Sequence, residues 1–143
     1  MRRILVASHG DLAVGLQHTA QMIMGVQENI SYYSLQAKEY PEDILCSIQK
    51  EIDDHREDEF IILTDLLGGS VCNILMRLAQ LPNIHVVSGM NLCMLLSVCM
   101  ADESYTTASI VEKAVNEARK NIVYINELWE RKEEILNDQD DED

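Results

Sequence analysis

The sequence is poor in positive charge and contains no long apolar run. Its 143 residues include 11 Lys and Arg against 25 Asp and Glu, which gives a formal net charge of −14. This balance argues against a nucleic-acid ligand, whose phosphates need basic side chains, and against an anionic membrane surface. No apolar stretch approaches the roughly 20 residues of a membrane span, and residues 4–7 are too short a run for a signal peptide. We therefore expect a cytoplasmic protein with no direct membrane insertion.

The sequence also lacks paired cysteines and the glycine patterns that hold nucleotides. Neither G-x-x-x-x-G-K-[ST] nor G-x-G-x-x-G occurs. No two of the four cysteines form a C-x-x-C pair, and they lie far apart or in apolar segments, so they indicate small core residues in a reducing compartment. We expect no cofactor and no metal. The cysteines are Cys46, Cys72, Cys93 and Cys99.

What the sequence does contain is a regular alternation of two patterns. Hydrophobic residues make up 47% of the chain, enough for a globular domain with its own core. Short apolar runs typical of strands alternate with amphipathic stretches typical of helices. This order predicts an α/β fold of three layers, an open, mostly parallel sheet with helices on both faces. The expected strands are residues 3–7, 30–35, 60–63, 84–87 and 122–125, and the expected helices are 12–24, 41–52, 70–79, 92–100 and 110–118.

The C-terminal region differs in composition from the rest. Residues 128–136 are compatible with a terminal helix, and five of the last six residues are acidic. Such a charge run indicates a solvated tail.

Polar residues follow two of the predicted strands. In open α/β sheets, ligands and reactive residues lie at the carboxyl ends of the strands, which is where these residues stand. His9 follows the first strand, and Asp65 follows the strand at residues 60–63. If these strands are neighbours, the two side chains emerge together. A carboxylate beside an imidazole holds one ring nitrogen and leaves the other as a nucleophile. His18, His55 and His85 occupy no such position and indicate structural or exposed residues.

The segment after Asp65 has the features of an anion cradle. Gly68 and Gly69 allow close approach of the backbone, and Ser70 opens a helix whose free N–H groups attract negative charge. Taken singly, the glycines also suit a tight turn and Asp65 a helix N-cap. Together with His9 they favour phosphoryl transfer, with the phosphoryl group arriving from and leaving to other molecules.

Apolar residues next to these turns are candidates for partner contacts. A partner must bring its own phosphorylatable side chain to His9, so its contact surface must surround that turn. Leu67 is the best candidate, because the glycines after it leave no bulky neighbour to cover it. Leu12 and Met90 are also compatible with core positions. The candidate contact residues are Leu12, Leu66, Leu67 and Met90.

Three motifs in order resemble one known family. A strand ends in Ser8-His9-Gly10, residues 65–73 read D-L-L-G-G-S-V-C-N, and residues 89–95 read G-M-N-L-C-M-L. Over residues 2–126 the sequence resembles the IIA component of the mannose family of the bacterial sugar phosphotransferase system. Val71 and Cys93 stand where that family usually has proline, and Leu67 replaces a common aromatic residue. These departures leave the histidine chemistry intact and bear on the identity of the acceptor.

The resemblance implies a specific activity. His9 is then the phosphorylated residue, with Nδ1 held by Asp65 and Nε2 carrying the phosphoryl group, so that the chain is a phosphotransferase with a phosphohistidine intermediate. The donor is phosphorylated HPr. The acceptor is a separate IIB component, since no IIB segment follows in this sequence.

The resemblance also implies an architecture. It predicts strand order 2-1-3-4 and a homodimer that exchanges an antiparallel strand formed by residues 122–125. The expected organisation is a IIA domain at residues 1–126 and a helical extension with an acidic disordered tail at residues 127–143.

Other functions remain open from the sequence alone. A related phosphocarrier feeds a dihydroxyacetone kinase and has a similar fold and histidine. A non-catalytic regulatory module of the same fold is a second alternative. A metal-chelating α/β enzyme is disfavoured, because no second histidine lies at a matching strand end.

Overall fold

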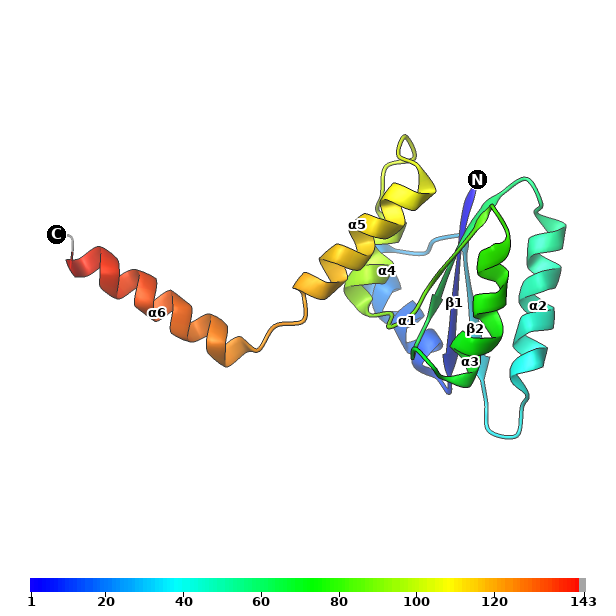
Figure 1. Cartoon of the computed structure of the whole chain (residues 1–143), viewed down its shortest axis with the longest axis horizontal. Helices are drawn as coiled ribbons and strands as arrows, with labels where there is room; N and C mark the ends of the chain where they lie inside the picture. Colours follow the sequence, from blue (N-terminus) through cyan, green and yellow to red (C-terminus); the bar gives the residue numbers. More distant parts are fainter. Residues whose placement is uncertain (142–143) are drawn as a thin grey trace.

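The computed structural model describes residues 1–141 and places four strands in one parallel sheet (Figure 1). The strands are β1 (Arg2–His9), β2 (Ile30–Leu35), β3 (Glu59–Thr64) and β4 (Ile84–Val87). Their order in the sheet is β2-β1-β3-β4, and all three pairings are parallel. The predicted strand order is confirmed, and β1 and β3 are neighbours. The carboxyl ends of both strands therefore lie at the same edge.

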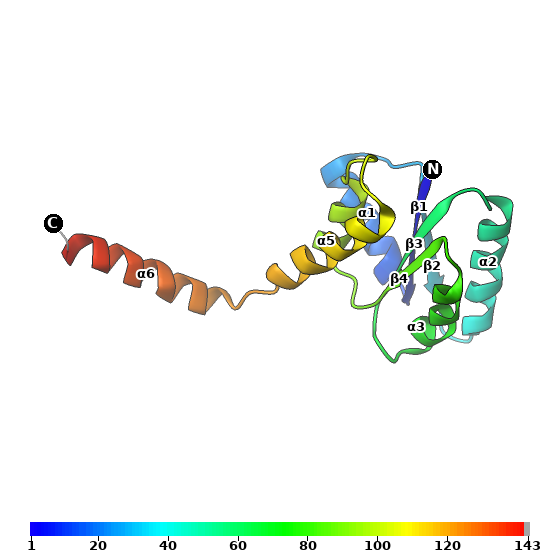
Figure 2. The same cartoon turned by 45° about the horizontal axis from the view of Figure 1, so that its top comes forward.

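Helices cover both faces of this sheet, which confirms the predicted three layers. In Figures 1 and 2, α2 and α3 lie on one side of the strands, and α1, α4 and α5 lie on the other. A short 3-10 helix, η1, continues α3. The helices are α1 (Leu12–Met24), α2 (Pro41–Asp54), α3 (Ser70–Leu75), η1 (Met76–Gln80), α4 (Leu92–Cys99), α5 (Thr107–Lys120) and α6 (Ile125–Asp141).

The central strand β1 is buried on both faces, because its side chains alternate between two cores. Ile4 and Val6 belong to the core beneath α1, α4 and α5. Leu5 and Ala7 belong to the core beneath α2 and α3. This double burial fixes the position of β1, and hence of His9 at its end.

The structure differs from prediction at residues 122–125. In the single chain residues 122–124 form no regular structure, and Ile125 begins α6. A strand needs a neighbour for its backbone groups, and here the Tyr124 carbonyl instead accepts from the amides of Glu127 and Leu128 in the first turn of α6. Pairing of this segment with a second subunit stays a prediction.

The terminal helix is longer than predicted. It runs through Asp138 and Asp140 to Asp141, where the acidic run had indicated a solvated tail. The side chains of residues 138–140 are nevertheless exposed, as the charge run requires. Residues 142–143 of the predicted tail lie outside the described residues.

The four cysteines are free thiols, and the prediction that all of them are core residues is wrong for one. Cys72 is buried and Cys93 and Cys99 are half-buried, whereas Cys46 is exposed. Cys46 lies on α2 beside the buried stripe of Ile44, Ile48 and Ile52 and points away from the core. None of the helices within residues 1–141 is long and apolar enough to cross a membrane.

Candidate functional site

His9 is the last residue of β1, and hydrogen bonds connect the end of this strand to α1 and to β2. The buried Ser8 hydroxyl accepts the backbone N–H of Ala13 at 2.8 Å and so caps the start of α1. Gly10 turns the chain with a φ of +55°, which favours glycine. Its N–H donates to the Leu35 carbonyl at the end of β2. The imidazole therefore projects from a fixed backbone.

Asp65 follows β3 and forms hydrogen bonds with both the backbone and the ring of His9. Its Oδ2 accepts the His9 backbone N–H at 2.8 Å and lies 2.7 Å from His9 Nδ1. Its Oδ1 accepts the Leu66 N–H at 2.9 Å. The Asp65 side chain is 10% exposed, whereas that of His9 is 46% exposed. A nearly buried carboxylate thus orients a ring that solvent and partners can reach.

The charge state of Asp65 decides which ring nitrogen carries hydrogen. Burial raises the pKa of this carboxyl, but donation from the His9 backbone, the His9 ring and the Leu66 backbone outweighs burial and holds the pKa below 3.8. Asp65 is therefore ionised at neutral pH and can only accept hydrogen bonds. It follows that Nδ1 carries the hydrogen and Nε2 presents a lone pair.

Ser70, the first residue of α3, lies against that second nitrogen. Its Oγ is 2.9 Å from His9 Nε2. Because Nε2 is an acceptor in this tautomer, the Ser70 hydroxyl donates to it. The ring is thus held at both nitrogens, by a carboxylate on one side and by a rotatable hydroxyl on the other.

The loop between Asp65 and Ser70 needs its two glycines for different reasons. Gly68 has a φ of +83°, a left-handed conformation that other residues avoid. A Cβ at Gly69 would lie 3.2 Å from His9 Cε1 and 3.2 Å from the Leu66 carbonyl oxygen. Asn73 secures the loop, since its side-chain amide donates to the Gly68 carbonyl at 3.1 Å. Sequence reasoning assigned no role to Asn73, although it closes the second quoted motif.

The predicted contact residues divide into three that are exposed and one that is not. Leu12, Leu66 and Leu67 are 50%, 63% and 72% exposed. Met90 is 7% exposed, so its prediction as a contact residue is wrong. The Met90 N–H donates to the Thr64 carbonyl at 3.0 Å, and its side chain belongs to the core beneath α1, α4 and α5. Across residues 1–141 we find no group of three or more His, Cys, Asp or Glu placed to hold a metal ion.

The fold and this cluster together define a class of protein. It is an open α/β protein whose candidate nucleophile is a histidine, oriented by an aspartate at the carboxyl edge of a parallel sheet. Residues 3–115 match the family described as "PTS system fructose IIA component", where PTS denotes the phosphotransferase system. The chain belongs to this mannose-type family of IIA components.

Relatives of known role are similar over most of the chain. The sorbose-specific EIIA component of Klebsiella pneumoniae is 29% identical over 110 residues, which cover 76% of this chain and 79% of that protein. The mannose-specific EIIAB component of Escherichia coli K12 is 27% identical over 122 residues, 83% of this chain but only 38% of that longer protein.

Solved structures show the same fold. The phosphotransferase system component EIIA from Streptococcus agalactiae superposes with a TM-score of 0.81 at 28% identity, over 88% of this chain and 98% of that one. The IIA protein associated with the fucose utilization operon of Streptococcus pneumoniae gives 0.79 at 28% identity, over 90% and 96%. Family and fold support a phosphocarrier role in a sugar phosphotransferase system.

Proposed function

We propose that this protein carries a phosphoryl group on Nε2 of His9, taking it from phosphorylated HPr and passing it to a IIB component. One observation carries the proposal. His9 is the histidine at the carboxyl end of the central strand, with Nδ1 held at 2.7 Å by Asp65 and a side chain that is 46% exposed. Family membership supports the identity of donor and acceptor.

The chemistry needs no external acid or base. The lone pair of Nε2 attacks the phosphorus of the donor phosphohistidine, so that one N–P bond forms as the other breaks. The donor nitrogen keeps the electron pair of the bond that breaks. Nδ1 retains its hydrogen, and the Asp65 carboxylate stabilises the positive charge that the phosphorylated ring acquires. Transfer to the acceptor repeats these steps with His9 as the leaving group.

Ser70 has a different part in each state. In the unphosphorylated protein its hydroxyl donates to Nε2. When the phosphoryl group takes that nitrogen, the hydroxyl rotates and donates to a phosphoryl oxygen instead. The backbone N–H groups at the start of α3 lie beside it and add positive potential where three oxygens bear negative charge. Gly69 keeps the space next to the ring open.

Docking of the donor relies on the exposed leucines. Leu66 and Leu67 follow Asp65 directly, and Leu12 lies in the first turn of α1 after His9. All three are apolar and exposed around a small polar site. A surface of this kind gives attraction through burial, while its modest area allows rapid exchange of partners.

The decisive test is the position of the label. The His9→Ala protein should take no phosphoryl group from phosphorylated HPr, whereas His18→Ala, His55→Ala and His85→Ala should be labelled like the parent. Incubation with Enzyme I, HPr and phosphoenolpyruvate, followed by mass spectrometry under alkaline conditions, measures this. Label that persists in His9→Ala would contradict the proposal.

A further inference from the structure

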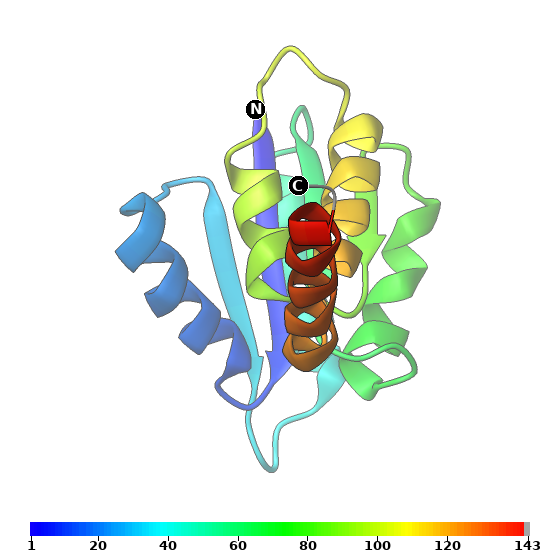
Figure 3. The same ribbon diagram turned by 90° about the vertical axis from the view of Figure 1, so that its left-hand side faces the viewer.

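Asn73 lies close to the His9 site, yet the proposed chemistry gives it no part. It is in α3, one turn after Ser70, and α3 begins at the same edge of the sheet as the end of β1 (Figure 3). The residue is exposed, so packing in the core does not determine where its side chain points. Its side-chain amide nevertheless donates to the Gly68 carbonyl at 3.1 Å, and its backbone N–H donates to the Gly69 carbonyl at 2.9 Å.

These two hydrogen bonds fix the orientation of two successive peptide groups. In a trans peptide the C=O and the N–H point in opposite directions. With the Gly68 carbonyl turned toward Asn73, the Gly69 N–H points the other way, where it donates to the Leu66 carbonyl at 3.0 Å. The peptide group between the two glycines is therefore held on both sides. Asn73 thus restrains a segment in which glycine would otherwise allow several conformations.

The restrained segment lies against the His9 ring. A Cβ at Gly69 would lie 3.2 Å from His9 Cε1, so the Gly69 backbone borders the ring closely. Ser70 follows directly, with its Oγ 2.9 Å from Nε2. Release of the Gly68 carbonyl would let Gly69 and Ser70 move, whereas Asp65 holds Nδ1 from its place directly after β3. The ring therefore has one support at the end of a strand and one on the glycine loop.

We propose that Asn73 is a positioning residue for phosphoryl transfer, which holds Gly69 and Ser70 so that Nε2 meets the incoming phosphorus in the reactive direction. The inference rests on the proposed function and adds to it a residue that forms no hydrogen bond with His9 itself. A donor is needed at this position, because the group to be held is a carbonyl oxygen. Asparagine supplies that donor on a short side chain and without charge.

The side-chain bond of Asn73 should matter more for the rate than for stability. Gly68 and Asn73 are both exposed, so water can satisfy the Gly68 carbonyl when the amide is removed. Asn73→Ala should therefore retain the fold, while Ser70 Oγ moves away from Nε2 for part of the time. Because a displacement of 1 Å costs about a hundredfold, an average displacement of about half that should lower the single-turnover rate about tenfold.

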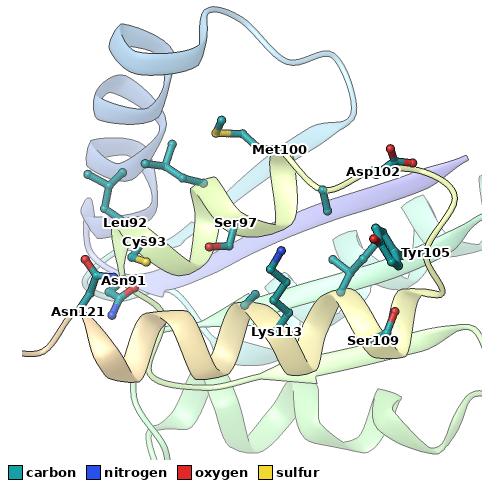
Figure 4. Close-up of a pocket in the computed structure, with 14 residues that line it drawn as sticks. Asn91, Leu92, Cys93, Ser97, Met100, Asp102, Tyr105, Ser109, Lys113 and Asn121 are labelled. Carbon is teal, nitrogen blue, oxygen red and sulfur yellow. The ribbon is translucent and has the colours of Figure 1, made fainter.

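Two variants and a matched control test the effect on the rate. Asn73→Asp keeps the shape of the side chain but replaces the donor by acceptors, which repel the Gly68 carbonyl, so it should slow transfer at least as much as Asn73→Ala. In the control, Asn121→Ala, the lost amide donates to the Glu117 carbonyl at the same 3.1 Å. Asn121 lines the groove between α4 and α5, which includes no residue of the His9 site (Figure 4). The control should transfer at the parental rate.

The rate is measured as single-turnover phosphorylation by saturating phosphorylated HPr, with urea unfolding in parallel. Saturating donor separates the rate of the chemical step from the affinity for the donor. A merely structural residue would lower the free energy of unfolding and leave the rate of the folded protein unchanged. A positioning residue lowers that rate while the protein stays folded.

The ring nitrogens of His9 give a second readout, by NMR of the unphosphorylated protein with isotope-labelled histidine. In Asn73→Ala the Nε2 resonance should shift, because the Ser70 hydroxyl donates to it for less of the time, whereas Nδ1 should keep its hydrogen. Ser70→Ala should shift Nε2 in the same direction. This measurement needs no donor, so it tests the inference even if the proposed function fails, and label on His9 tests the function even if the inference fails.

A double-mutant cycle shows whether Asn73 acts through Ser70. If it does, Asn73→Ala should slow the parent about tenfold but slow Ser70→Ala less than about threefold. Any of four results would overturn the proposal: parental rates in Asn73→Ala and Asn73→Asp; an unmoved Nε2 resonance in Asn73→Ala; equal slowing of the parent and of Ser70→Ala; or a rate loss that merely matches the loss of folded protein.

Discussion

Gly69 lies close against the His9 ring, and a single added methyl group there should disturb transfer without disturbing the fold. In Gly69→Ala the new Cβ would lie 3.2 Å from His9 Cε1, where ordinary contacts begin at 3.4 Å. It would also lie 3.2 Å from the carbonyl oxygen of Leu66, which is backbone and cannot swing away. The His9 ring must therefore move away from the new Cβ by a few tenths of an ångström.

Such a shift matters because the ring has little freedom. Its two nitrogens are engaged at 2.7 Å by Asp65 and at 2.9 Å by Ser70, so movement lengthens at least one of these bonds. A misplacement of 1 Å costs about a hundredfold in rate, so a few tenths should cost about three- to tenfold. The φ of Gly69 is −73°, which alanine also adopts, so the loss in free energy of unfolding should be limited to about 1 kcal/mol from the close contact with the Leu66 carbonyl oxygen.

Two other glycines serve as controls. Gly15 lies inside α1, where an added Cβ would meet nothing within 4 Å, so Gly15→Ala should stabilise the helix by about 0.5–1 kcal/mol and leave transfer unchanged. Gly68 also has open space but a φ of +83°, so Gly68→Ala should cost about 1–2 kcal/mol of stability. Single-turnover phosphorylation by phosphorylated HPr, with urea unfolding in parallel, measures both quantities. Transfer at the parental rate in Gly69→Ala, with unmoved His9 ring resonances, would refute the reasoning.

Four further outcomes follow from the site and the C-terminal segment. Asp65→Asn should slow transfer about a hundredfold or more, because the amide has one acceptor oxygen and no negative charge, so it cannot accept from both His9 and the Leu66 N–H or stabilise a positive ring; an unchanged rate would count against the orienting role. Since the folded pKa of Asp65 is lowered, its contribution to stability should be complete above about pH 5 and be lost as pH falls through that pKa. Urea unfolding from about pH 3 to 7 should therefore show a smaller loss of stability at low pH in Asp65→Asn than in the parent. Leu67→Asp should weaken transfer from phosphorylated HPr without unfolding the protein, whereas Met22→Asp, a change at a still more exposed position on α1, should not; loss of the fold in Leu67→Asp would show a core role. Removal of residues 122–143 should give monomer or aggregate in light scattering, and a stable, active dimer without them would remove the predicted exchange of that segment.

The sequence allowed the positions of His9 and Asp65 to be predicted because each follows a continuous apolar run. Buried parallel strands produce such runs, and their carboxyl ends meet at one edge, so two residues 56 positions apart in sequence were expected side by side. Leu67 was expected to be exposed for a similar reason, since two glycines follow it. These predictions depended on backbone topology alone.

Features that depend on side-chain direction were harder to predict. Met90 also follows a strand, yet a hydrogen bond from its N–H to the Thr64 carbonyl turns the chain so that its side chain enters the core. The contact of Ser70 Oγ with Nε2 needs the loop conformation set by Gly68 and Asn73. Ile125 was expected in a strand, but in the single chain it has no neighbouring strand and joins the helix instead.

The location of His9 has a kinetic consequence. One ring nitrogen is already committed to Asp65, and the other opens at a single edge of the sheet, flanked by the same three leucines whichever molecule approaches. Two macromolecules cannot occupy that edge together. Under the proposed function, a donor and an acceptor therefore compete for it, and steady-state rates should follow a ping-pong pattern of parallel double-reciprocal lines, with excess unphosphorylated donor acting as a competitive inhibitor of the acceptor.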